Sequence, residues 1–166
     1  MVLLVQSVVL CVIFTFLILP PQFKNPLSQI TSYPPAIRKR VESLPQYKKS
    51  LKPTKKKNLL RKVIGALVSM VVLAFLAFFS GKRDFTSAFV HVFILFLAVN
   101  IYDLVIFDFI VFPNSKKMII PGTEDMTKEY KNPIHHIIGA GKGIIIGTIA
   151  AAFSGTMVEI IRLFDK

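Results

Sequence analysis

Four long apolar runs constrain the fold of this chain more than any other feature. They cover residues 2–19, 63–79, 85–112 and 134–161, and a helix needs roughly 20 mostly apolar residues to cross the hydrocarbon core of a bilayer. Hydrophobic residues make up 53% of the 166 residues, which is more than a soluble domain of this length needs and more than a disordered chain could carry. The sequence therefore predicts an all-α fold: an integral membrane bundle of four transmembrane helices in a single membrane domain, residues 1–166.

The uneven distribution of basic residues predicts the orientation of this bundle. Twelve Lys and Arg residues and a single acid, Glu42, lie between Lys24 and Lys62, and four more basic residues lie in the loop at 113–133. The turn after the second run and the C-terminal end carry two basic residues each. Because cytoplasmic loops are rich in Lys and Arg, we expect the loops at 20–62 and 113–133 in the cytoplasm and both termini outside.

The first run is expected to remain as a helix and not to be cleaved as a signal peptide. It lacks a positively charged start, and Leu19-Pro20-Pro21-Gln22 is not a small-residue cleavage site. The single cysteine, Cys11, excludes a disulfide framework and a cysteine-based zinc site.

The first cytoplasmic loop contains a predicted short amphipathic helix. It starts in Ser32-Tyr33-Pro34-Pro35, because proline suits the first turn of a helix, and it ends before Pro45. Ile37, Val41 and Leu44 then fall on one face. We expect this interfacial helix to lie on the membrane with that face among the lipid headgroups.

The basic residues of the same loop predict a contact with anionic lipid headgroups at the cytoplasmic face, or with a partner protein. Each such charge near an anionic leaflet contributes about 1 kcal/mol. Because topology and lipid attraction already account for the charge, we do not expect nucleic-acid binding. The predicted contact residues are Arg38, Lys39, Arg40, Lys55, Lys56, Lys57, Arg61 and Lys62.

The second cytoplasmic loop, residues 113–133, combines turn and helix-start signals. The segment Ile120-Pro121-Gly122-Thr123-Glu124-Asp125 predicts a turn with Thr123 as a helix N-cap, and Pro133 is expected to begin the fourth helix. His135 and His136 point about 100° apart on that helix, which does not suit a shared metal ion. With Glu124 and Asp125 they leave a metal site as an alternative, but we predict no metal and no cofactor.

Four polar residues interrupt the third and fourth runs: Asn100, Asp103, Asp108 and Lys142. An ionisable residue at the bilayer centre costs at least ~2.5 kcal/mol on insertion scales, so each needs a partner or a function. On the predicted topology Asp103 and Lys142 lie at matching depths, roughly 14 and 12 Å from the cytoplasmic ends of their helices. We favour an ion pair between them that fixes the packing of the third and fourth helices; a snorkelling Lys142 is an alternative.

As a functional alternative, the same four residues would line a polar cavity that is open to the cytoplasm. The catalytic candidates in this cavity would be Asp103, Asp108 and Lys142. Its mouth would hold Glu124, Asp125, His135 and His136. On an α-helical wheel Asn100 and Asp103 lie about 60° apart, and Asp108 lies about 80° to the other side of Asn100. Asp108 is therefore expected to face another helix or the headgroups. Near the outer ends, a local Glu159–Arg162 pair is favoured over a His91–Glu159 contact.

Small residues recur at every fourth position of the fourth run. Residues at i and i+4 share a helix face, and faces of small residues let transmembrane helices approach closely. The partner of this face is left open between the second or third helix of the same chain and a second copy. The predicted packing residues are Gly139, Gly143, Gly147, Ala151 and Gly155.

Three motifs occur together in this chain: Tyr33-Pro34-Pro35 in the first loop, Asp103 with Asp108 in the third run, and the segment Ile120–Asp125. With them the chain resembles a group of small bacterial proteins with four transmembrane helices and no assigned function, across most of its length. The resemblance implies this architecture and a multi-pass location in a bacterial plasma membrane. It implies no mechanism.

The sequence is compatible with three functions. A structural or regulatory subunit needs only the small-residue face, the ion pair and the basic surface, and we rank it first. A membrane enzyme acting on a lipid or lipid phosphate would use Asp103 or Asp108 as a base, but no nucleophile–base set stands out. A proton- or ion-coupled transporter would use the same aspartates and would require a homo-oligomer, since four helices are few and no inverted repeat is visible.

Overall fold

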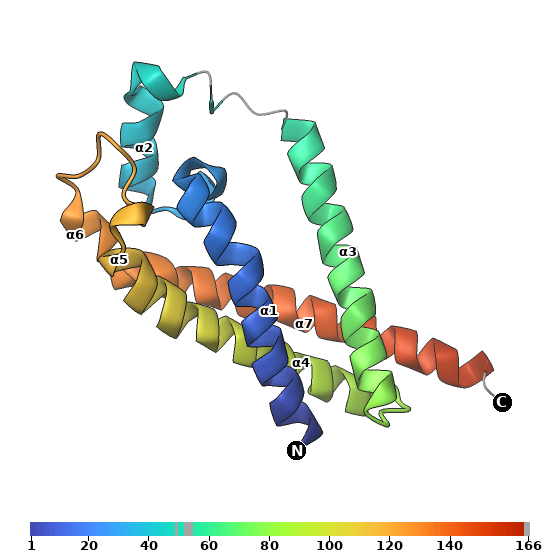
Figure 1. The fold of residues 1–166 in the computed structure, drawn as a ribbon. Coiled ribbons are helices and arrows are strands. Elements are labelled where there is room, and N and C mark those ends of the chain that lie inside the picture. Colours follow the sequence, from blue (N-terminus) through green and yellow to red (C-terminus); the bar gives the residue numbers. More distant parts are fainter. Residues whose placement is uncertain (49, 52–54, 165–166) are drawn as a thin grey trace. The chain divides into compact units, whose positions relative to one another are not determined.

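The chain is helical throughout the part that the computed structural model describes, residues 1–48, 50–51 and 55–164, with backbone only for residues 55–59, 61 and 62 (Figure 1). Helices make up 84% of the structure, and this described part contains no strand. The fold class is therefore all-α, as predicted. In chain order the elements are α1 (Val2–Lys24), η1 (Pro26–Ser32), α2 (Pro35–Ser43), η2 (Pro45–Tyr47), α3 (Lys55–Phe79), α4 (Phe85–Tyr102), η3 (Asp103–Val111), α5 (Phe112–Asn114), η4 (Lys116–Met118), α6 (Thr127–Tyr130) and α7 (Pro133–Phe164).

Three helical segments in the described residues are long and apolar enough to cross a membrane: Val2–Lys24, Phe85–Asn114 and Thr127–Phe164. The second predicted run corresponds to a shorter apolar helix, Val63–Phe79, within α3. These lengths and compositions are consistent with a membrane protein. The helix α1 continues past the predicted end at Leu19, with Pro20 and Pro21 inside it.

The chain divides into two compact units, which we describe separately. Unit one comprises residues 1–10, 54–100 and 141–166, and unit two comprises residues 11–53 and 101–140. The helices α1 and α7 each contribute to both units. The single membrane domain proposed from the sequence stays a prediction.

Unit one has a core of small and branched side chains from three helices. Ala77 of α3, Ala88 and Val92 of α4, and Ala151 and Val158 of α7 are fully buried in it. Small side chains at these positions allow close helix packing. The helix α4 starts after Asp84, whose carboxylate accepts hydrogen bonds from the backbone N–H and the hydroxyl of Ser87, and these bonds lower the pKa of Asp84 below its ordinary value.

A few polar contacts join the helices of unit one. The Gln6 amide of α1 donates to Ser80 Oγ at 2.9 Å, and its oxygen lies 2.8 Å from His91 Nε2 of α4. Glu159 forms an ion pair with Arg162 and also accepts a hydrogen bond from a backbone N–H of α4. The predicted local Glu159–Arg162 pair is thus confirmed.

Unit two has an aromatic core in which segments of both predicted loops meet. Tyr33, Ile37 and Val41 of the first loop are 0% exposed and pack in one cluster with Phe112, Met118, Ile120 and Tyr130. The expectation that the apolar face of α2 lies among lipid headgroups is therefore wrong, because the segment from Phe112 to Tyr130 covers that face inside the protein.

The turn at Ile120–Asp125 is tied into this core. Gly122 has φ of 89°, a left-handed conformation that favours glycine, and a Cβ there would lie 2.8 Å from Leu44 Cδ1. Thr123 is not a helix N-cap as predicted; its buried hydroxyl donates to Ile120 O at 2.7 Å and lies 2.7 Å from the Tyr130 hydroxyl, and α6 begins only at Thr127. Thr123 cannot cap a helix because its hydroxyl bonds back to Ile120 within the turn, four residues before α6 begins.

Two tyrosines bond the first loop to the second. Tyr33 donates to Met118 O at 2.9 Å, and Tyr47 donates to Pro121 O at 3.0 Å. Burial, with the neighbouring Tyr130, raises the pKa of Tyr33 above its ordinary value, so this hydroxyl remains a donor. The helix α7 begins at Pro133, as predicted. The two loops thus form one folded module.

Candidate functional site

The third apolar run changes from an α-helix to a π-helix at its first aspartate. The π segment η3 covers Asp103–Val111, and the N–H of the residue that follows it, Phe112, bonds to Phe107 O, five residues back. In a π-helix the backbone hydrogen bonds join residues i and i+5. Such segments are rare in proteins, and those that occur are often found at functional sites. Asp103 and Asp108 have this spacing, so the π geometry brings them to one side.

Both aspartates line a cavity of about 140 Å³ in unit two, which we call the carboxylate cavity. The other polar side chains in its wall are Gln22, Gln29 and Ser32. The α-helical wheel that placed Asp103 and Asp108 on either side of Asn100 does not apply, because the segment from Asp103 to Val111 is π-helical.

Asp108 is also paired with a histidine of another helix. His136 Nδ1 of α7 donates to Asp108 Oδ1 at 2.9 Å, with side-chain exposures of 5% for the histidine and 27% for the aspartate. The ring of Phe112 meets the imidazole edge to face at 5.1 Å. The expectation that Asp108 faces another helix is confirmed. His136 was not predicted as its partner. A signal was present in the sequence, because Asp108 lies near the end of the third apolar run and His136 near the start of the fourth, and the loop at 113–133 connects these two ends.

The second ring nitrogen of this histidine, Nε2, is buried and has no hydrogen-bond partner among the described residues. A buried polar atom without a partner is uncommon and costs about 1–3 kcal/mol. It therefore points to a water or ligand atom that would complete the bonding of His136.

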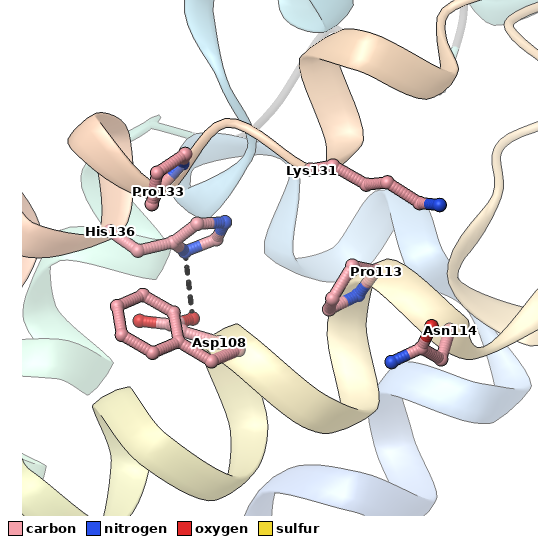
Figure 2. A pocket seen from close by; sticks show the side chains of 7 residues that line it. Asp108, Pro113, Asn114, Lys131, Pro133 and His136 are labelled. Atoms are coloured by element: carbon pink, nitrogen blue, oxygen red, sulfur yellow. Dashed lines mark ion pairs between the residues drawn. The ribbon is translucent and has the colours of Figure 1, made fainter.

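A larger cavity, of about 370 Å³, opens beside the Asp108–His136 pair; we call it the His136 pocket. Figure 2 shows the paired Asp108 and His136 on one side of it, Lys131 and Asn114 on the other, and Pro113 between them. Phe109 and Pro133 complete its wall. Asp108 lies in the walls of both the carboxylate cavity and the His136 pocket, so the two cavities meet at this residue.

The other residues predicted at the cytoplasmic mouth have separate partners. His135 Nε2 lies 3.0 Å from Ser32 O, and the Glu124 carboxylate accepts a hydrogen bond from Gly122 N–H. Asp125 is exposed. Within the described ranges, no group of three or more His, Cys, Asp and Glu side chains is placed to hold a metal ion, so the alternative of a metal site formed by this set has no geometric support.

Asn100 and Lys142 belong to unit one, whereas Asp103 belongs to unit two. Lys142 is exposed. The Asp103–Lys142 ion pair therefore stays a prediction.

The small-residue face of α7 packs against α4 within unit one. A Cβ at Gly147 would lie 2.5 Å from the ring of Phe96, a Cβ at Gly155 would lie 2.9 Å from Phe85 O, and a Cβ at Gly143 would overlap the Asn100 amide. Ala151 is fully buried. Gly139 has no heavy atom within 4 Å of its Cβ position. The partner left open by the sequence is thus α4 for Gly143, Gly147 and Gly155.

The predicted basic contacts are described only in part. Lys39 and Arg40 of α2 are exposed, and Arg38 is half-buried. Arg40 Nε donates to Gly122 O at 3.4 Å, a long hydrogen bond. The side chains of Lys55, Lys56, Lys57, Arg61 and Lys62 lie outside the described residues.

Comparisons with protein-family models, with curated proteins and with solved structures find no match for this chain. The candidate site therefore rests on its geometry.

Proposed function

We propose that this chain is a multi-pass protein of a bacterial plasma membrane, with four transmembrane helices and both termini outside. It acts as a structural or regulatory subunit whose basic cytoplasmic surface contacts anionic lipid or a partner membrane protein, including a second copy. The observation that carries the proposal is the joint folding of the two basic loops around Tyr33, Ile37 and Val41.

This module presents basic side chains on a fixed support. Because α2 buries Ile37 and Val41 inside the protein, Lys39 and Arg40 are held on its outer side and are exposed. The second loop adds the exposed side chains of Lys116 and Lys117. Each charge near an anionic leaflet contributes about 1 kcal/mol, so a folded basic module selects anionic lipid without requiring a catalytic group.

Reversing two charges of α2 is expected to reduce anionic-lipid enrichment. In Lys39→Glu/Arg40→Glu, we expect the ratio of phosphatidylglycerol to phosphatidylcholine that copurifies from mixed vesicles to fall by about fivefold or more, since two favourable charges become repulsive. The matched control Lys82→Glu/Arg83→Glu changes the turn predicted outside and should leave the cytoplasmic-leaflet contact intact. An equal loss in both variants would contradict the proposal.

The predicted orientation can be tested by labelling. With Cys11 replaced by alanine, a cysteine introduced at Thr127 should react only from the cytoplasm, whereas tags at the two ends of the chain should be reached only from outside. A cytoplasmic N-terminus would contradict the topology and with it the location of the basic surface.

A lipid-directed enzyme is a second candidate, and the Asp108–His136 pair favours it. A carboxylate that holds one imidazole nitrogen orients the other for proton transfer. Turnover of a lipid by the purified protein, lost in His136→Gln, would support this function over that of a subunit.

A further inference from the structure

We infer that the His136 pocket binds the phosphate group of one membrane phospholipid. The inference rests on the proposed function in one respect: the proposed topology places the pocket at the cytoplasmic surface of the membrane. It adds a specific site, formed by other residues than the basic surface of α2.

The donors around the pocket match a phosphate. His136 Nε2 is a buried ring nitrogen without a partner in the described structure. It can donate an N–H to a phosphate oxygen while Asp108 holds the N–H of Nδ1. Lys131 and Asn114 lie on the opposite side of the same pocket (Figure 2). Pro133 and His136 are in the first turn of the 32-residue helix α7, whose N-terminus favours an anion.

The charge of the pocket also favours an anion. The Asp108 carboxylate is already engaged by His136 Nδ1 at 2.9 Å. Lys131 is exposed and adds one positive charge to the wall. A cation in the pocket would be repelled by Lys131, and the Asp108 carboxylate that could attract it is already bonded to His136.

The surroundings favour a lipid over a dissolved phosphate. The wall comes from the end of one apolar segment, at Asp108–Asn114, and from the start of another, at Lys131–His136. Large apolar side chains that neighbour the wall residues in sequence are exposed: Ile110 by 52%, Ile134 by 64% and Ile137 by 53%. These surfaces suit acyl chains, and about 370 Å³ is within the usual range for a small-molecule site.

Native mass spectrometry of the full chain in detergent tests the inference. The probes are phosphatidylglycerol, phosphatidylcholine, diacylglycerol and inorganic phosphate. We expect one high-occupancy molecule of either phospholipid and none of diacylglycerol, because the phosphodiester is what the pocket recognises. Lys131→Met should weaken phospholipid binding about tenfold, the effect of one charged hydrogen bond, and Lys131→Arg should restore it.

The control is Lys128→Met, an exposed lysine of α6 outside the pocket wall, which should bind phospholipid like the wild type. Diacylglycerol binding as well as the phospholipids, inorganic phosphate binding where phospholipid does not, or equal effects of Lys131→Met and Lys128→Met would each overturn the inference. The outcome is separable from that of the proposed function, because charge reversal on α2 changes the preference for anionic lipid, whereas this pocket accepts both phospholipids.

Discussion

Replacing Gly147 with isoleucine is expected to lower the melting temperature of the purified protein by about 6–12 °C. A Cβ at this position would lie 2.5 Å from Cδ1 and 2.9 Å from Cγ of Phe96, and isoleucine adds three further carbons. Overpacking of this kind typically costs up to about 3 kcal/mol, and each kcal/mol shifts the melting temperature of a chain of this size by about 2–4 °C. Thermal unfolding in detergent, followed by the loss of helical signal or by tryptic cleavage, measures the effect.

Gly141→Ile is the matched control for this variant. Gly141 lies in the same helix and the same unit, and no heavy atom lies within 4 Å of its Cβ position. The change in intrinsic helix propensity is identical, so the difference between the two variants isolates the contact with Phe96. Equal destabilisation would show that the small-residue face of α7 does not require close packing against α4.

The features that could be predicted from the sequence are those that depend on local composition. Apolar runs of sufficient length identified the helices, Pro133 marked the start of α7, and the four-residue spacing of small side chains identified the face that meets α4. Each of these follows from helix periodicity and from the steric properties of one residue type.

The features that could not be predicted depend on contacts between distant segments. The apolar face of α2 looks the same whether lipid or protein covers it, and only the folded second loop shows that Ile37 and Val41 are buried in protein. The spacing of Asp103 and Asp108 in the sequence does not indicate a π-helix, so an α-helical wheel placed the two side chains on different sides of the helix. That Asp108 lines both the carboxylate cavity and the His136 pocket could be seen only in the structure.

Removing the carboxylate of Asp108 is expected to destabilise the protein by about 1–3 kcal/mol, the cost of leaving a buried polar group without its hydrogen bond. The His136 side chain is 5% exposed and loses the partner of its Nδ1. In Asp108→Leu, both nitrogens of the buried His136 imidazole would lack partners. His136→Leu should cost less, because the remaining carboxylate can be reached by water. Melting temperatures of the two variants and of the double variant Asp108→Leu/His136→Leu complete a double-mutant cycle.

The double variant should recover part of the loss of Asp108→Leu, because no buried imidazole is left unpaired. Contacting residues in such cycles show interaction energies of about 0.5–3 kcal/mol, and strictly additive losses would contradict the pairing. Asp108→Asn separates charge from hydrogen bonding: its amide oxygen can still accept from His136 Nδ1–H, so it should retain more stability than Asp108→Leu. If Asp108→Asn were as unstable as Asp108→Leu, the negative charge itself, and not the 2.9 Å hydrogen bond, would hold His136 in place beside its pocket.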